Sequence, residues 1–144
     1  MLENSVHVNY LDSLLKGDRN KCRSIIEQVL QSGTPANVVY SDIIWPMMVE
    51  IEKLARNDRI MPPAENLATR INRTIVDQLQ NKLPRKSTRN KKIIICCAEE
   101  ELQELGAQIT ADLFESDGWQ VKFLGGGLTN DDILSYTFPF ACNS

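Results

Sequence analysis

The sequence predicts an α/β protein in which an N-terminal four-helix bundle is followed by a partial βαβ unit. Up to residue 83, apolar residues recur every three or four positions, as they do on the buried face of a helix. From residue 91 onward the period changes to short β-branched runs, and a basic segment that contains proline separates the two patterns. We therefore expect a helical domain over residues 5–83, a linker over 84–90 and an incomplete βαβ domain over 91–144.

The first two helices are recognised by their ends and their apolar stripes. Gly17 closes the first helix, and Asp18 is placed to cap the second, because its carboxylate can accept a free backbone N–H. Ser32 and Gly33 end that second helix. The stripes consist of Leu11, Leu14 and Leu15 in the first helix and of Ile25, Ile26, Val29 and Leu30 in the second.

Two longer helices complete the predicted bundle. Thr34 and Pro35 start the third, since the threonine hydroxyl can accept a backbone N–H and proline loses nothing at the first helical position. A bend or interruption is expected where Trp45 meets Pro46. The prolines at 62–63 open the fourth helix. The buried stripes are Val38, Ile44, Met48, Ile51 and Leu54 in the third helix and Ala64, Leu67, Ala68, Ile71, Ile75 and Leu79 in the fourth.

The second domain is expected to be a right-handed βαβ crossover. Residues 93–97 form a short, continuously apolar run, which is typical of a strand buried on both faces of a parallel sheet. A helix follows and ends at Asp117 and Gly118, after which residues 119–123 alternate as a second strand, and Thr129 can cap a further helix. The apolar face of the crossover helix consists of Leu105, Ile109, Leu113 and Phe114.

Two strands make only the beginning of a doubly wound sheet. Residues 137–144 contain Pro139 and end in polar residues, which argues against a third strand. The incomplete sheet would expose an apolar edge and much of one face, so self-association through that edge is one expected outcome. We interpret the chain as a truncated or frame-shifted product whose tail is not native to the fold.

Charge and hydropathy exclude several classes of partner. The net charge of -3 gives no general attraction to phosphate, so direct binding to nucleic acid is not expected. The basic residues between 85 and 92 could form a local phosphate-binding patch, but the lack of aromatic residues for base stacking favours a solvated linker. No stretch approaches the roughly 18 apolar residues of a membrane span, and the N-terminus lacks a leader pattern, so we expect a cytoplasmic protein without membrane contact.

The cysteines predict neither a disulfide framework nor a zinc site. Cys22, Cys96, Cys97 and Cys142 are scattered and lack the paired spacing of zinc ligands, so we interpret them as reduced thiols that are buried or half-buried. Because Cys96 and Cys97 are adjacent at a strand end, their side chains should point to opposite faces of the sheet. We therefore expect that they do not share one metal ion.

The order of these elements resembles the cobalamin-binding family, in which a helical cap is joined to a Rossmann-like (flavodoxin-like) domain, as in methyltransferase corrinoid proteins and cobalamin-dependent transcriptional regulators. Residues 8 to 136 carry the resemblance. Residues 43–51 resemble the third helix of the family's cap, residues 64–68 its fourth helix, and residues 118–125 the second strand and its glycine end. The resemblance implies cobalamin as the cofactor, with haem as a minor alternative.

The resemblance also implies site residues in the second domain. Residues 101–106 occupy the place of the family's Asp-x-His-x-x-Gly motif, with Glu101 for the aspartate, Gln103 for the histidine and Gly106 retained. That histidine is the family's lower axial ligand to cobalt, so no protein metal ligand is expected here and the cofactor would keep its own lower base. The triple glycine after the second strand contributes Gly125 and Gly126 as candidate cofactor-binding residues, although such a run also simply ends a strand.

In the cap, Glu65 and Asn66 occupy the place where light-sensing relatives have Glu-His, and both are candidate cofactor-binding residues. Those relatives have tryptophan ten residues before the glutamate, where this chain has Ala55. Photochemical sensing is therefore not expected. Trp45 is interpreted as a core or boundary residue.

Other polar residues are assigned structural roles. His7 is the single histidine and is expected to be exposed or to pack in the first helix, with no metal role. The carboxylates between residues 99 and 104 are interpreted as the first turn of the crossover helix, where they meet the positive end of its dipole. No nucleophile and base pair and no Walker-type loop is recognised, so catalysis by this chain alone is not expected.

Three functions remain open on the sequence alone. The first is a cobalamin carrier or sensor that holds the corrinoid between cap and sheet, with a methyltransferase as the partner of a carrier. The second is a cofactor-free regulatory or interaction module with a partner such as a transcription factor, although no helix-turn-helix is present for direct DNA recognition. The third is a non-functional remnant of a longer gene.

Overall fold

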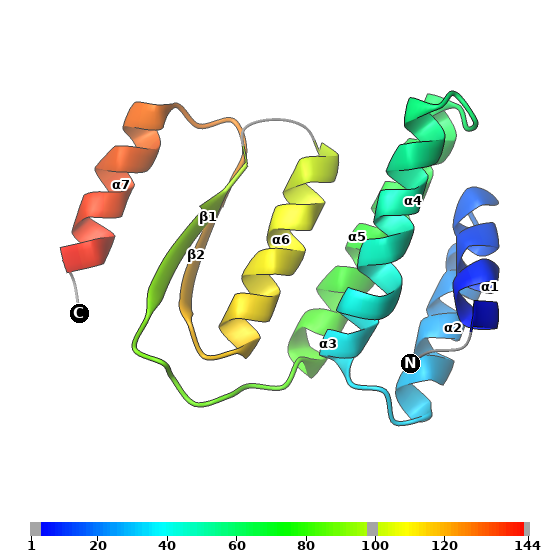
Figure 1. Ribbon diagram of the computed structural model, residues 1–144, viewed down its shortest axis with the longest axis horizontal. Helices are drawn as coiled ribbons and strands as arrows, with labels where there is room; N and C mark the ends of the chain where they lie inside the picture. The colour runs from blue at the N-terminus through cyan, green and yellow to red at the C-terminus, as the bar shows by residue number, and fades with distance from the viewer. Residues whose placement is uncertain (1–3, 98–100, 143–144) are drawn as a thin grey trace. The chain divides into compact units, whose positions relative to one another are not determined.

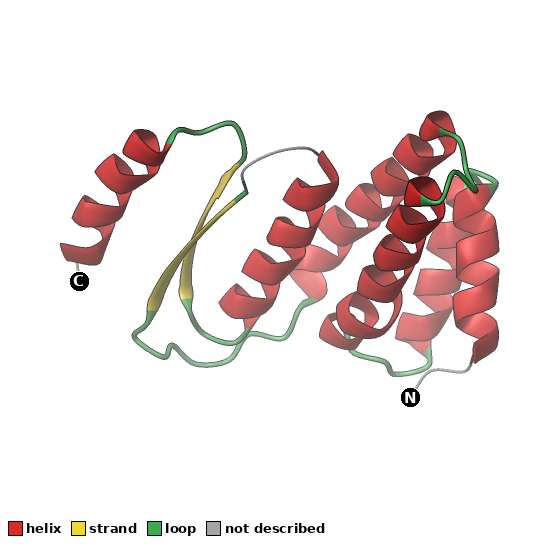
Figure 2. Ribbon diagram, turned by 45° about the horizontal axis from the view of Figure 1, so that its top comes forward, coloured by secondary structure: helices red, strands yellow, loops and turns green. Residues whose placement is uncertain are grey.

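The computed structural model describes residues 4–97 and 101–142, and for residues 101–103 it describes the backbone alone. The chain divides into two compact units, Met1–Pro84 and Arg85–Ser144 (Figure 1). The first unit is entirely helical, and the second contains the two strands with their helices (Figure 2). The predicted class, a helical bundle followed by a partial Rossmann-like unit, is confirmed.

The helical unit consists of helices whose order and boundaries follow the predicted pattern closely. Its elements are α1 (Asn4–Leu15), α2 (Arg19–Gln31), α3 (Ala36–Val39), the π-helical turn η1 (Tyr40–Ile44), α4 (Trp45–Arg56), α5 (Pro62–Leu79) and the 3₁₀ turn η2 (Gln80–Lys82). Because α3, η1 and α4 follow one another without a break, the unit is a bundle of four helical segments.

Two of the three predicted helix starts are confirmed. Asp18 caps α2 by accepting a hydrogen bond from the backbone N–H of Lys21 at 3.0 Å, and α5 begins at Pro62. The predicted cap at Thr34 is wrong. The residue that precedes α3 is Pro35, and no side chain caps that helix start.

The irregular turn η1 lies immediately before Pro46, where the sequence predicts a bend. Proline has no N–H for the carbonyl of Asp42 four residues earlier, so the α-helical pattern cannot continue through this point. The backbone widens to a π-helical turn, in which the N–H of Trp45 donates to the carbonyl of Tyr40. The third predicted helix is therefore continuous but irregular.

The core of the helical unit combines aliphatic packing with two buried tyrosines. The hydroxyl of Tyr10 donates to Oδ1 of Asn72 at 2.7 Å, and the hydroxyl of Tyr40 donates to the carbonyl of Val76 at 2.9 Å. Both bonds tie α5 to other helices, because Asn72 and Val76 lie on α5. Fully or nearly fully buried residues include Leu14, Cys22, Ile26, Val39, Ile43, Ile44, Ile51, Ala68, Ile71, Ile75 and Leu79.

Two predicted core positions are on the surface. Leu67 is 42% exposed, and its side chain packs against Gly17. Gly17 has a left-handed φ of 68°, and a side chain at this position would collide with Leu67. Trp45, interpreted as a core or boundary residue, is 43% exposed, as is Val49 one turn further along α4. The exposed Trp45 and Val49 lie on one face of α4.

The second unit contains the predicted crossover. Its elements are β1 (Lys92–Cys96), α6 (Glu101–Ser116), β2 (Gln120–Gly125) and α7 (Asn130–Cys142). The strands are parallel, with Lys92 beside Gln120 and Ile95 beside Phe123, and the register shifts after Ile95. Figures 1 and 2 show the strands between α6 and α7, so the two helices cover opposite faces of the sheet.

The last helix begins as predicted and runs further than predicted. Thr129 and Asp132 cap α7 reciprocally: the N–H of Thr129 donates to the carboxylate of Asp132, and the N–H of Asp132 donates to the hydroxyl of Thr129, each at 3.1 Å. Residues 137–142, interpreted as part of a non-native tail, form the second half of α7 with Pro139 inside it. Residues 143 and 144 lie outside the described residues.

The segment 85–89, interpreted as solvated linker, is attached to the end of α6. The N–H of Lys86 donates to the carbonyl of Ser116 at 2.9 Å, and the N–H of Arg89 donates to the carbonyl of Gly118 at 3.0 Å. The side chains of Lys86 and Arg89 both contact Asp117, at 3.1 and 3.0 Å. The hydrogen bond from Lys86, with Arg89 adding to it, holds the pKa of Asp117 below its ordinary value. The segment therefore belongs to the second unit.

Candidate functional site

The carboxyl ends of β1 and β2 meet at one edge of the sheet. The backbone N–H of Cys97 donates to the carbonyl of Gly125 at 3.0 Å, which joins the two strand ends directly. In open α/β sheets, ligands bind at the carboxyl ends of the strands, because the loops that follow parallel strands gather there. This edge is therefore the candidate site of the second unit.

The glycines after β2 leave backbone uncovered at this edge. A Cβ on Gly125 would lie 3.6 Å from Oε1 of Glu104, and a Cβ on Gly126 would lie 3.4 Å from both the carbonyl oxygen and Sγ of Cys97. Gly125 has a left-handed φ of 72°, which disfavours other residues. Gly127 has a left-handed φ of 76°, and no atom lies within 4 Å of the position that a Cβ would take there. We call Gly125, Gly126 and Gly127 the glycine cradle; open space lies beside Gly127, whereas Gly125 and Gly126 face Glu104 and Cys97.

The structure brings two residues to this cradle that the sequence analysis assigned elsewhere. The sequence predicts Cys97 to be a buried or half-buried thiol, and the structure confirms that it is half-buried. Glu104 is predicted only as part of a helix-dipole cluster. Glu104 lies three residues after Glu101, so the two positions share a face of α6. This helical spacing is the sequence signal that could have placed Glu104 with the predicted site residue Glu101. The sequence alone does not show that this face meets Gly125.

The predicted residues of the 101–106 motif lie in the first turns of α6. Gly106 is half-buried, and its carbonyl accepts a hydrogen bond from the hydroxyl of Thr110 at 2.9 Å. The backbone of Glu101 and Gln103 is helical, and their side chains lie outside the described residues. The motif thus begins the helix that follows β1, which is where the predicted crossover requires it.

The thiols at the end of β1 are not arranged as a metal site. The predicted burial is wrong for Cys96 and Cys142, which are both exposed. Cys96 lines a hollow beside α7, whereas Sγ of Cys97 lies near Gly126. Burial raises the pKa of the Cys97 thiol, and the charge of Glu104 and then Cys96 raise it further. The thiol therefore stays protonated near neutral pH, and a protonated thiol is a poor ligand. In the described part of the chain, no group of three or more His, Cys, Asp or Glu residues could hold a metal ion.

Glu65 and Asn66, the predicted cap residues, lie in the first turns of α5. Glu65 is half-buried and its carbonyl accepts the hydroxyl of Thr69 at 2.9 Å, while Asn66 is exposed. They belong to the helical unit, whereas Gly106, Gly125 and Gly126 belong to the sheet unit. The candidate residues thus form one set in each unit.

The single histidine makes a hydrogen bond within the helical unit. Nε2 of His7 lies 2.5 Å from the carbonyl oxygen of Asp42, and since a carbonyl only accepts, the ring nitrogen donates. His7 packs across to η1 as a structural residue. No imidazole exists between residues 85 and 144, so the sheet unit has no histidine to offer a metal.

The basic residues between 85 and 92 all contact other residues of the sheet unit. Its five residues each have a partner: Arg85 with Glu115, Lys86 and Arg89 with Asp117, Lys91 with the ring of Trp119, and Lys92 with Phe140. Nζ of Lys92 also donates to the carbonyl of Phe140 at 2.9 Å. These contacts compete with any external phosphate, and the interpretation as a phosphate-binding patch gains no support.

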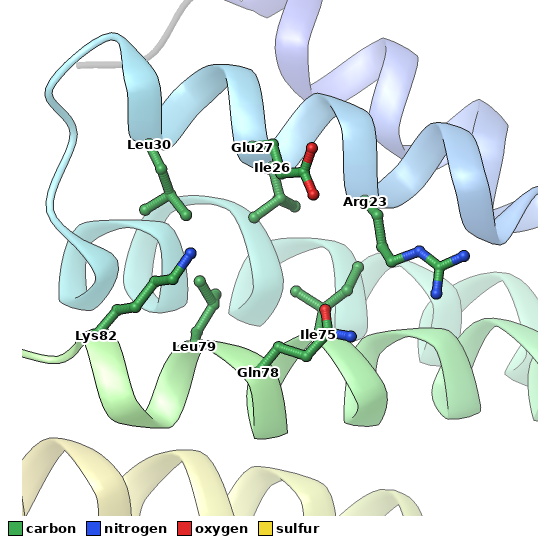
Figure 3. Close-up of a pocket in the computed structure, with 8 residues that line it drawn as sticks. All are labelled: Arg23, Ile26, Glu27, Leu30, Ile75, Gln78, Leu79 and Lys82. Carbon is green, nitrogen blue, oxygen red and sulfur yellow. The ribbon is translucent and has the colours of Figure 1, made fainter.

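The helical unit carries a small groove between α2 and the end of α5 (Figure 3). Ile26 and Leu30 of α2 face Ile75 and Leu79 of α5 across the groove, and Arg23 and Lys82 lie toward its two ends (Figure 3). Its volume is about 50 Å³, which corresponds to one or two water molecules. The groove is far too small for a large planar cofactor.

The helical unit matches a known protein family. A family model described as the B12 binding domain matches residues 7–80, which is just over half of the chain and covers most of the helical unit. The chain belongs to the B12 binding domain family. A comparison with curated protein sequences gave no match.

Solved structures with this B12 binding domain fold resemble both units of the chain. The monomethylamine corrinoid protein of Methanosarcina barkeri has a TM-score of 0.82 at 14% identity, over 96% of this chain and 66% of that one. A chain of the methanol:cobalamin methyltransferase complex from Methanosarcina barkeri has a TM-score of 0.58 at 12% identity, over 95% and 53%. A cobalamin-binding protein from Desulfitobacterium hafniense has a TM-score of 0.52 at 15% identity, over 98% and 66%. This chain spans between about half and two thirds of the length of those chains.

The B12 binding domain family implies a corrinoid, and the residues present fit part of it. Within the glycine cradle, open space lies beside Gly127, where the backbone can approach a bulky ligand. The sheet unit contains no histidine that could be a protein ligand to cobalt, and His7 in the helical unit donates to the carbonyl of Asp42.

No described helix is both long enough and apolar enough to cross a membrane.

Proposed function

We propose that this B12 binding domain is a cobalamin carrier that presents the methyl group of its corrinoid to a partner methyltransferase. The observation that supports it most is the family match over residues 7–80, joined to a fold similarity to corrinoid proteins that extends over both units. Two of the similar solved structures are a monomethylamine corrinoid protein and part of a methanol:cobalamin methyltransferase complex. A methyltransferase is therefore the proposed partner class.

The proposed binding residues come from both units. In the sheet unit, Gly106, Gly125 and Gly126 allow backbone to approach the corrinoid, and Glu101 and Gln103 are the polar residues of the same helix start. In the helical unit, Glu65 and Asn66 are proposed to contact the corrinoid as part of the cap. When bound, cobalamin supplies the methyl-transfer chemistry, and the protein orients the cofactor and excludes water.

The cobalt ligand is the finer part of the proposal. Since Gln103 replaces the histidine, we propose that cobalamin binds with its own lower base on cobalt. A glutamine amide is a weak ligand and has no ring nitrogen that a neighbouring carboxylate could polarise. This distinguishes the chain from relatives in which the protein displaces that base.

The test is binding of two corrinoids that differ in the lower base. The purified chain is incubated with hydroxocobalamin or with cobinamide, which lacks that base, and bound corrinoid is measured from the visible spectrum after gel filtration. Retention of hydroxocobalamin with a base-on spectrum is the expected result. Loss of both corrinoids on the column would reject the corrinoid-binding proposal, and retention of hydroxocobalamin with a base-off spectrum would reject the ligand assignment alone.

A matched pair of variants tests the glycine cradle. Gly126→Leu places an aliphatic side chain against Cys97 and is expected to weaken corrinoid retention at least about tenfold, because the side chain occupies the proposed approach path. Lys122→Leu adds the same side chain at an exposed position of β2 and is expected to retain the corrinoid. Equal retention by both variants would remove the cradle from the site.

A sensor role is less well supported than a carrier role. The positions that correspond to the light-sensing tryptophan and histidine are Ala55 and Asn66. The haem alternative and a transcription-factor partner gain no support from the comparisons.

A further inference from the structure

We draw no further inference here: the strongest candidate, the groove between α2 and the end of α5 with Arg23 and Lys82 toward its two ends, is lined by aliphatic side chains, and nothing in the structure shows what covers it.

Discussion

The ring of His7 on α1 donates a hydrogen bond from Nε2 to the carbonyl oxygen of Asp42 in η1, at 2.5 Å. That carbonyl lies four residues before Pro46, which has no N–H to offer it. A side chain from another helix therefore replaces the missing backbone donor. A partly buried carbonyl without a donor is costly, so this contact explains how the bundle accommodates a proline inside a long helix.

We predict that His7→Ala lowers the free energy of unfolding of the helical unit by about 1–2 kcal/mol, because it leaves the Asp42 carbonyl without this donor. The measurement is urea denaturation followed by circular dichroism. The control is Pro46→Ala, which restores an N–H at position 46. In the Pro46→Ala background the cost of His7→Ala should fall to less than half. An equal cost in both backgrounds would show that His7 acts by packing alone.

We predict that Gly118→Ala destabilises the sheet unit by about 3 kcal/mol or more. Gly118 has a left-handed φ of 97°, and a Cβ there would lie 2.2 Å from the backbone carbonyl oxygen of Ser87. The residue therefore allows the 85–89 segment to lie against the end of α6. Unfolding is followed by the fluorescence of Trp119 after Trp45 has been replaced by phenylalanine.

Gly127→Ala is the matched control for this change. Its φ of 76° is also left-handed, but no atom lies within 4 Å of the added methyl group. Only backbone strain of about 1–2 kcal/mol is expected. If both variants lose the same stability, strain rather than contact with Ser87 accounts for the glycine at 118.

We predict that Cys22 resists thiol reagents while the chain is folded. Burial, with a smaller effect from the charge of Asp18, raises the pKa of the Cys22 thiol from 9.0 to about 11. At pH 8 the thiolate fraction is then about a hundredfold lower than in the unfolded chain. Iodoacetamide labelling followed by mass spectrometry of peptides should modify the exposed Cys142 in the native protein and Cys22 only after addition of urea. Rapid native labelling of Cys22 would contradict this.

The same shift predicts an alkaline loss of stability. Because the folded pKa of Cys22 is raised, the unfolded chain releases the thiol proton first as the pH increases. The contribution is complete below about pH 9 and is lost as the pH rises towards 11. Cys22→Ala should therefore have a smaller fall in the free energy of unfolding than wild type between these values.

We predict that the bond between Tyr10 and Asn72 contributes to stability as a pair. Both side chains are buried, and the hydroxyl donates to Oδ1 at 2.7 Å. Tyr10→Phe leaves Oδ1 of Asn72 without this donor and should cost about 1–3 kcal/mol in urea denaturation. The double variant with Asn72→Leu should cost less than the sum of the two single changes. Additive costs would indicate that the bond itself contributes little.

Local patterns predicted most of the fold. The caps at Asp18 and Thr129, the start of α5 at Pro62 and the βαβ crossover depend on residues a few positions apart, and short-range chemistry is readable in a sequence. Thr34 failed as a cap because Pro35 takes the position before the helix. α7 extends past Pro139, although proline usually ends a helix.

The sequence by itself determined the order of the elements and the parallel crossover. Only the tertiary structure decided that His7 donates a hydrogen bond to the carbonyl of Asp42, and that Glu104 and Cys97 lie beside the glycines after β2. It also decided that the basic residues from 85 to 92 contact other residues of their own unit. The physical reason is distance along the chain. Periodicity and capping act between neighbours, whereas these contacts join residues that are brought together only by the packing of helices and strands.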